Sequence, residues 1–293
     1  MTARILIIAG SDSGGGAGVQ ADIKTVTLLG GHAMTAITAI TAQNTLGVQA
    51  VHLVPTDMVL AQIDSVVNDI GVDAVKIGMI GSAETANAVA ERLCSPPFVE
   101  TKEIAAVSYP DQVKWETRER VTRVEKIPIV FDPVMVATSG SALADEATIA
   151  VFHRLMTLAD VTTPNIPELK VLSGMSTVDA ESRLSAARAL VRASGKPLLL
   201  KGGHGRGRTI RDLLVWPGGS LSEWQGDRID TDHSHGTGCT LASAIAAGLG
   251  ESWPLEASID RARRYVRAAL EGAPGLGLGH GPMGVPLGFD ADV

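Results

Sequence analysis

One stretch of the chain combines glycines, threonines and a cysteine in a spacing that suits phosphate chemistry. Residues 235–240 read His-Gly-Thr-Gly-Cys-Thr, and a run of small, mostly apolar residues continues to Gly248. The two glycines let the backbone turn sharply and approach a ligand closely. The apolar run predicts a buried helix that begins at Cys239 or Thr240. Because the first N–H groups of a helix lack internal partners and attract anions, we expect an anion pocket here.

Cys239 is a candidate base or nucleophile at the start of this helix. A helix start stabilises a thiolate, which would lower the cysteine pKa from about 8.5 toward neutrality. The structural alternative is a small buried side chain, which is the commoner role of a single cysteine. An acyl-transfer pair of Cys239 with His235 is unfavourable, because a glycine turn separates the two and no residue orients the histidine.

A second glycine-rich loop lies close to the N-terminus. Residues 14–18 read Gly-Gly-Gly-Ala-Gly, between a predicted strand and a predicted helix, and residues 16–21 match the dinucleotide pattern G-x-G-x-x-A. A dinucleotide site also needs an acidic residue about 20 positions further on, to bind the ribose. Residues 30–55 contain no acidic residue. We therefore reject a nicotinamide or flavin site and expect the loop to approach some other ligand.

Composition excludes several classes of protein. The formal net charge of −7 argues against a general nucleic-acid surface. The two cysteines, Cys94 and Cys239, match neither a disulfide framework nor a zinc spacing, which is typical of a reducing cytoplasm. The N-terminal apolar run is too short for a signal peptide, and no apolar stretch is long enough to span a membrane. We expect a cytoplasmic protein without nucleic-acid or membrane partners.

Hydrophobic periodicity predicts strands that alternate with helices. Strands are expected at 4–9, 33–42, 48–54, 73–79, 129–133, 160–163 and 197–201, helices at 18–29, 56–70, 83–93, 144–158, 177–194 and 255–271, and a hairpin at 210–224. This alternation predicts one α/β domain over residues 1–293, with a mostly parallel sheet and helices on both faces. Ligands bind such sheets beyond the carboxyl ends of the strands. Six polar or sulfur-containing residues fall at predicted strand ends: Gln43, Met79, Asp132, Asn165, Lys201 and Cys239.

Residues 95–126 interrupt the pattern. The segment contains Pro96, Pro97 and Pro110, and from Val99 to Lys126 it has six acidic and six basic residues. Mixed charge of this kind is typical of a solvated surface segment. We therefore predict a surface insertion that takes no part in the chemistry.

The motifs together resemble the hydroxymethylpyrimidine/phosphomethylpyrimidine kinases of thiamine biosynthesis, in the ribokinase-like superfamily. The residues that carry the resemblance are 8–12, 15–22, 41–45, 76–79, 132–135, 163–165, 201–204 and 235–240. The resemblance implies a ribokinase-like fold and ATP-dependent phosphorylation of 4-amino-5-hydroxymethyl-2-methylpyrimidine, followed by phosphorylation of the monophosphate to the diphosphate. Sugar kinases of this superfamily mostly have an aspartate base where Cys239 stands, and the cysteine indicates the pyrimidine and pyridoxine branch.

The resemblance also implies roles for individual residues. The implied catalytic group is Cys239, Gly236, Gly238 and Lys201. The implied pyrimidine contacts are Gln43, Asp22, Met79 and Gly10, the implied ATP contacts are Asn165, Lys201, His204 and Thr237, and Asp132 and Glu168 are implied around Mg²⁺. ATP and Mg²⁺ are the expected cofactors, and a homodimer is the expected assembly. Thr138 departs from the family, which often has lysine at that position.

Two alternatives stay open on the sequence. A pyridoxal/pyridoxine kinase of the same superfamily acts on a similar hydroxymethylated heteroaromatic ring. A ligand sensor without catalytic activity could retain the fold and bind a pyrimidine. The sensor is less favoured, because a protein that only binds has no need of a phosphate pocket together with Lys201 and Asn165.

Overall fold

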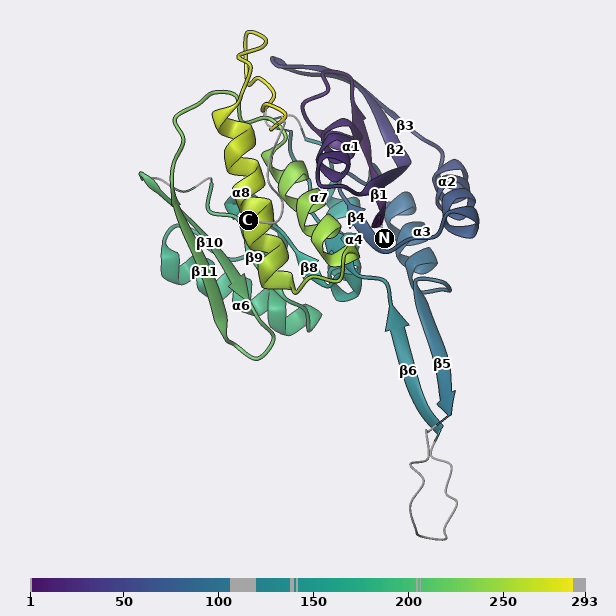
Figure 1. The fold of residues 1–293 in the computed structure, drawn as a ribbon. Helices are drawn as coiled ribbons and strands as arrows, with labels where there is room; N and C mark the ends of the chain where they lie inside the picture. Colours follow the sequence, from purple (N-terminus) through teal and green to yellow (C-terminus); the bar gives the residue numbers. More distant parts are fainter. Residues whose placement is uncertain are drawn as a thin grey trace.

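The computed structural model describes residues 2–105, 120–137, 140, 142–203, 205 and 207–286. Its centre is a nine-stranded sheet in the order β11-β10-β9-β8-β7-β4-β1-β2-β3 (Figure 1). The strands are β1 (Arg4–Asp12), β2 (His32–Asn44), β3 (Gly47–Leu53), β4 (Ala74–Ile77), β7 (Ile129–Phe131), β8 (Val161–Thr162), β9 (Leu198–Leu200), β10 (Thr209–Val215) and β11 (Leu221–Asp227). The six strands from β2 to β9 are parallel, and β3, β10 and β11 add antiparallel edges. The predicted α/β class is confirmed.

Helices cover both faces of this sheet. They are α1 (Gly18–Leu28), α2 (Thr56–Asp69), α3 (Ala83–Leu93), α4 (Glu146–Leu158), α5 (Ile166–Ser173), α6 (Ala180–Ser194), α7 (Thr237–Gly250) and α8 (Leu255–Glu271). Side chains alternate between the two faces of a strand. Accordingly, Leu6 and Ile8 of β1 belong to a core with α2–α6, whereas Ile5 and Ile7 belong to a second core with α1, α7 and α8.

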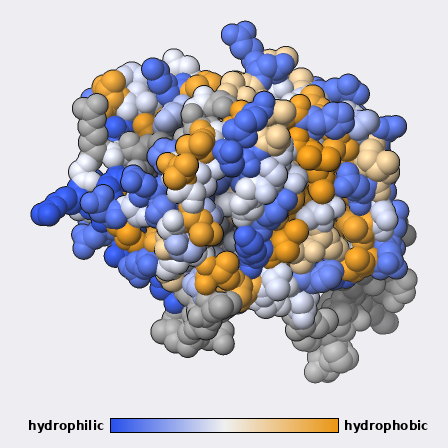
Figure 2. All heavy atoms as spheres, turned by 90° about the horizontal axis from the view of Figure 1, so that it is seen from above, coloured by the Kyte–Doolittle hydropathy of each residue, from blue (hydrophilic) through white to orange (hydrophobic). Residues whose placement is uncertain are grey.

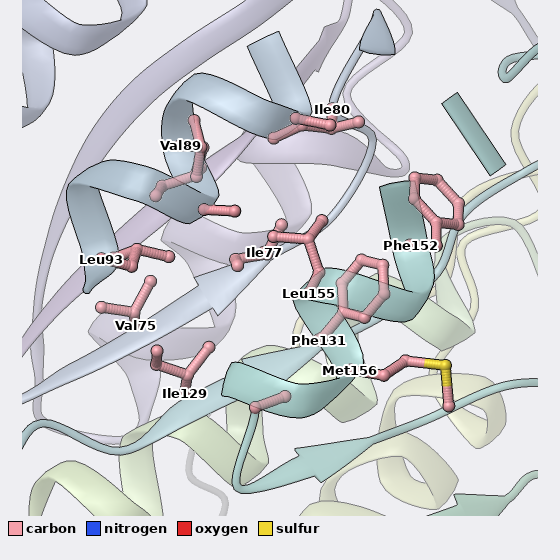
Figure 3. Close-up of a cluster of buried hydrophobic side chains, with 14 of the residues drawn as sticks. Val75, Ile77, Ile80, Val89, Leu93, Ile129, Phe131, Phe152, Leu155 and Met156 are labelled. Carbon is pink, nitrogen blue, oxygen red and sulfur yellow. The ribbon is translucent and has the colours of Figure 1, made fainter. Parts of the chain in front are cut away.

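The larger core is built from aliphatic residues and a few aromatic ones. Figure 3 shows Val75, Ile77, Ile129 and Phe131 of the sheet among side chains of α3 and α4. The rings of Phe131 and Phe152 meet edge to face with their centroids 5.2 Å apart. Such packing fixes the strands and therefore the loops that follow their carboxyl ends.

Residues 95–126 form a feature that the sequence did not predict. Strands β5 (Val99–Ala105) and β6 (Arg120–Lys126) pair antiparallel, with Val99 opposite Lys126, and extend away from the rest of the molecule (Figure 1). Within the described residues they pair with no strand of the large sheet. Phe98 is fully buried and accepts a hydrogen bond from the Ile127 N–H at 3.0 Å, so the base of this hairpin is anchored in the core.

Two helices also differ from the prediction. Helix α7 begins at Thr237, two residues before Cys239. Helix α5 was not predicted as an element, because it has only eight residues and contains Pro167. Proline is tolerated in the first turn of a helix, where its missing N–H has no partner to lose.

The surface is mixed in character. Figure 2 shows the face seen from above in Figure 1, with hydrophobic side chains dispersed among hydrophilic ones. Across the described ranges of the chain, none of the helices combines the length and the hydropathy that a membrane span requires.

Candidate active site

Three neighbouring strands of the sheet and the start of α5 bring a largely buried cation and two carboxylates to one place. Asp132 follows β7, Thr163 follows β8 and Lys201 follows β9. The Lys201 ammonium donates to Oδ1 of Asp132 at 2.6 Å, and the Thr163 hydroxyl donates to the same oxygen at 3.0 Å. Oε2 of Glu168 lies 3.8 Å from Nζ of Lys201. The parallel sheet therefore assembles the charged centre that the strand ends predicted.

Asn165 and Glu168 are tied to each other at the start of α5. The Asn165 side chain accepts from the Glu168 N–H at 2.8 Å, and Oε2 of Glu168 accepts from the Asn165 N–H at 2.7 Å. This reciprocal capping box satisfies two N–H groups of the helix start. Burial raises the pKa of Glu168 to about 7, although the Lys201 charge opposes that rise. The ATP contact of Asn165 and the metal contact of Glu168 stay predictions.

The start of α7 lies against this charged centre. A Cβ atom placed on Gly238 would lie 3.2 Å from Nζ of Lys201 and 3.3 Å from Oδ2 of Asp132. Gly236 has φ +90°, and a Cβ there would lie only 1.9 Å from the carbonyl oxygen of Gly16. Among the described residues, the N–H groups of Gly238 and Cys239 have no hydrogen-bond acceptor. The structure thus brings the predicted glycine turn, Lys201 and Asp132 together.

Cys239 differs from the prediction in its acidity. The thiol receives a hydrogen bond from the Gly18 backbone, and burial raises its pKa to about 11. The positive charge of Lys76 opposes this rise, while the negative charges of Asp22 and Asp132 add to it. The predicted shift toward neutrality is wrong for this structure, because loss of water around the thiolate outweighs the field of the helix start.

Asp22 has partners that the sequence analysis missed. The Lys76 ammonium donates to Oδ2 of Asp22 at 2.7 Å, and the Ser243 hydroxyl donates to Oδ1 at 2.7 Å. All three side chains are buried. The available signal was Lys76 itself, a single charge within an otherwise apolar strand. Contact of Asp22 with a substrate stays a prediction, and both of its oxygens are already bonded.

The other predicted substrate residues lie near the glycine-rich loops. A Cβ atom placed on Gly10 would lie 3.0 Å from Sδ of Met79, so these two residues lie close together. The Gln43 side chain reaches His235, with Nε2 of each 3.1 Å apart. Since His235 precedes Gly236, the predicted substrate and anion sites adjoin.

Two predicted positions lie outside the described residues, namely His204 and Thr138. Near His204, Arg228 donates hydrogen bonds to the carbonyl oxygens of Gly203 at 2.8 Å and Gly205 at 2.7 Å. Arg228 was not singled out in the sequence, and it joins this loop to the end of β11. Over the part of the chain that the structure describes, no group of three or more His, Cys, Asp or Glu side chains could hold a metal by itself.

Comparison with known families decides the family to which this site belongs. The model of the family described as phosphomethylpyrimidine kinase matches residues 12–101 and 111–284. The chain belongs to this phosphomethylpyrimidine kinase family. Between residues 12 and 284 the family match leaves only 102–110 uncovered, and these lie within the segment predicted as an insertion.

Curated relatives agree with the family match. The chain is 42% identical over 283 residues to the hydroxymethylpyrimidine/phosphomethylpyrimidine kinase of Rhizobium meliloti, covering 96% of this chain and 95% of that protein. It is 45% identical over 280 residues to the thiamine biosynthesis bifunctional protein ThiED of Geobacter sulfurreducens, covering 95% of this chain. The chain spans 51% of that relative's length and 34% of the multifunctional ThiED of Corynebacterium efficiens.

Experimental structures show the same fold. The phosphomethylpyrimidine kinase of Clostridium difficile aligns with a TM-score of 0.71 at 31% identity, covering 92% of this chain and 99% of that one. The ADP complex of Bacillus subtilis pyridoxal kinase aligns with a TM-score of 0.78 at 28% identity, covering 97% of each chain. The predicted ribokinase-like fold is confirmed.

Proposed function

We propose that this chain phosphorylates 4-amino-5-hydroxymethyl-2-methylpyrimidine with ATP, and then phosphorylates the monophosphate to the diphosphate. The observation that carries the proposal is the close approach of Gly238, at the start of α7, to Lys201 and Asp132. Such a centre offers backbone N–H groups and a largely buried ammonium to an anion. The family membership and the names of the relatives supply the substrate class.

Phosphoryl transfer depends on neutralising charge and on positioning the acceptor, with little covalent chemistry for the protein. The N–H groups of Gly238 and Cys239 and the ammonium of Lys201 would bind the transferred group. The hydroxymethyl oxygen would lie beside Cys239. For the second phosphorylation the acceptor is already an anion, so no alcohol proton has to be removed.

Mg²⁺ fits the carboxylates of this site. Mg²⁺ is commonly held by one or two carboxylates together with phosphate oxygens and waters. Oδ1 of Asp132 is bonded by Lys201 and Thr163, while Oδ2 lies toward Gly238. We propose that Asp132 and Glu168 hold the ion, and that the bound ion supplies positive charge beside the phosphates.

Cys239 is proposed as the base for the alcohol, provided that its thiol is deprotonated first. With a pKa of about 11 the thiol is protonated at neutral pH. It can accept a proton only after it has lost its own. Positive charge added near Asp132 would favour that loss, because the Asp132 carboxylate is one of the charges that raise the pKa.

Pyridoxal kinase activity is the second candidate, and the structural similarity to pyridoxal kinases favours it. A coupled ATPase assay with hydroxymethylpyrimidine, its monophosphate and pyridoxal as separate acceptors distinguishes the two. We expect the highest kcat/KM with the pyrimidines. A higher kcat/KM with pyridoxal would make pyridoxal kinase the better-supported function. Binding of a pyrimidine without turnover would indicate a ligand sensor. Lys201→Met should abolish turnover and serves as the negative control.

We also propose a homodimer that pairs through β3. This strand is an edge of the large sheet and carries no Asp, Glu, Lys or Arg, and Val51 and Leu53 are exposed along it. Exposed apolar edge strands tend to pair with another chain. Light scattering after size-exclusion chromatography should show a dimer for the wild type and a monomer for Val51→Lys.

We propose a cytoplasmic location because Cys94 is an exposed free thiol, which is typical of a reducing compartment.

A further inference from the structure

His235 connects the two glycine-rich loops with the end of β2. Its Nε2 lies 3.0 Å from Oδ2 of Asp12 and 3.1 Å from Nε2 of Gln43, so the expectation that no residue orients this histidine is wrong. Its backbone N–H donates to the carbonyl oxygen of Gly281 at 3.2 Å. The residue is only 8% exposed, and it directly precedes Gly236, whose φ is +90°. A side chain in this position affects both the predicted acceptor site and the start of α7.

The charge of Asp12 decides which ring atom of His235 carries a hydrogen. Burial alone would raise the pKa of Asp12, but hydrogen bonds from His235, Ala17 and Gly14 outweigh it and lower the pKa. Asp12 is therefore a carboxylate at neutral pH and can only accept hydrogen bonds. Consequently Nε2 of His235 carries a hydrogen and donates it to Asp12.

This assignment also decides the orientation of the Gln43 amide. A ring nitrogen that carries a hydrogen cannot accept one from an amide NH₂ group. On the other side of the amide, Oε1 lies 3.3 Å from the Thr41 hydroxyl, whose one hydrogen is directed to the Ser11 carbonyl oxygen at 2.8 Å. Exchanging the two ends of the amide removes the donor–donor clash at His235 and lets the NH₂ group donate to the Thr41 hydroxyl oxygen, while the amide oxygen shares the one Nε2 hydrogen with Asp12 in a three-centre bond. The Gln43 oxygen then faces His235, and the NH₂ group faces Thr41.

We propose that His235 is a positioning residue that fixes the Gln43 amide so that an N–H group is presented to the acceptor. One N–H binds Thr41, and the other remains for a hydrogen-bond acceptor such as an unprotonated ring nitrogen of a heteroaromatic substrate. Loss of His235 would let the amide present either its oxygen or its nitrogen. The inference rests on the proposed function, because it requires Gln43 to contact the phosphate acceptor.

A double-mutant cycle tests whether His235 affects substrate binding through Gln43. The four proteins are the wild type, His235→Ala, Gln43→Ala and the double variant, assayed for the KM of hydroxymethylpyrimidine and of ATP. Each single change should raise the pyrimidine KM about tenfold, the usual effect of one lost hydrogen bond. In the Gln43→Ala background, His235→Ala should raise the pyrimidine KM by less than about a further twofold. The KM of ATP should stay within about twofold of the wild type in all four proteins. Since Gly236 adjoins His235, kcat is recorded separately.

Two further variants separate positioning from simple damage to the fold. His235→Gln retains an N–H near the position of Nε2 and should restore most of the pyrimidine KM. His153→Ala removes an exposed histidine of α4 and should change nothing. If His235→Ala fails to fold, the cycle is run with Asp12→Asn in its place. Additive effects on KM, or no rescue by His235→Gln, would overturn the inference. A wild type without pyrimidine turnover would instead overturn the proposed function.

Discussion

Nζ of Lys76 lies 2.7 Å from Oδ2 of Asp22, and neither side chain has any exposed surface. The pair joins β4 to α1, and Ser243 adds α7 through its bond to Oδ1 of Asp22. Taking two ions out of water costs several kcal/mol for each, which their mutual attraction largely offsets. Both charges act on the pKa of Cys239, Lys76 lowering it and Asp22 raising it. The pair therefore belongs to the electrostatics of the site as well as to its core.

Lys76→Met should reduce the free energy of unfolding by about 3–5 kcal/mol, because it leaves the Asp22 carboxylate buried without its cation. Urea unfolding measures the change. The double variant Lys76→Met/Asp22→Leu should recover most of the loss. The control is Arg211→Met, which breaks the exposed ion pair with Glu223 and should change stability little. Equal losses in Lys76→Met and in the double variant would show that packing matters more than charge.

Gly236→Ala should disrupt the anion pocket. The new Cβ would meet the Gly16 carbonyl oxygen at 1.9 Å, and φ of +90° disfavours any side chain. We expect a loss of at least about 2 kcal/mol of stability, from strain and the displaced loop, and a fall in kcat of at least about a hundredfold. Gly195→Ala is the matched control, since Gly195 also has positive φ but nothing lies within 4 Å of its Cβ position. That control should cost about 1 kcal/mol with normal kcat.

The Cys239 thiol should ionise only at alkaline pH. Burial raises its pKa to about 11, above the value of about 8.5 in an unfolded chain. Its contribution to stability is therefore complete below about pH 8.5 and is lost as the pH rises through the folded pKa. The difference in thiolate ultraviolet absorbance between the wild type and Cys239→Ala reports the titration. A midpoint near neutrality would show that the helix start dominates after all.

Cys239→Ala should affect the two phosphorylations differently. If Cys239 removes the alcohol proton, kcat for the first step should fall by about 10²- to 10⁴-fold, and the second step should be affected less. Cys239→Ser should resemble alanine, because a hydroxyl is far less acidic. Both steps are to be measured on the same preparation. Equal losses would indicate a damaged anion pocket, and a stability loss of about 1 kcal/mol with both steps intact would indicate a structural cysteine.

The hairpin β5–β6 should be dispensable for the reaction. Val99 and Lys126 are opposite each other, so residues 100–125 can be replaced by a two-residue Asn-Gly turn. Phe98 and Ile127 are retained because they anchor the hairpin base. We expect kcat within about threefold of the wild type, since loops distant from a site are tolerant to change. A hundredfold loss with an intact fold would mean that the segment contributes to the site.

Local sequence determined the alternation of elements and the strand-end positions of the polar residues. The apolar run before Gly10 and the small residues after Cys239 specify a strand and a helix by pattern alone. The capping pair Asn165 and Glu168 is also a short-range signal, although α5 itself was missed. Charged, proline-containing sequence concealed the hairpin β5–β6, because residues 99–126 lack the regular apolar alternation from which a strand is predicted.

Only the tertiary structure decided which charges meet and how much water reaches them. Lys76 and Asp22 are 54 positions apart, and nothing local predicts their contact. His235 and Asp12 are 223 positions apart, and their contact depends on two loops that pack together. The pKa of Cys239 also depends on the tertiary structure. The helix start was visible in the sequence, but the burial that outweighs it arises from packing of α7 against α1 and the sheet, which no local pattern encodes.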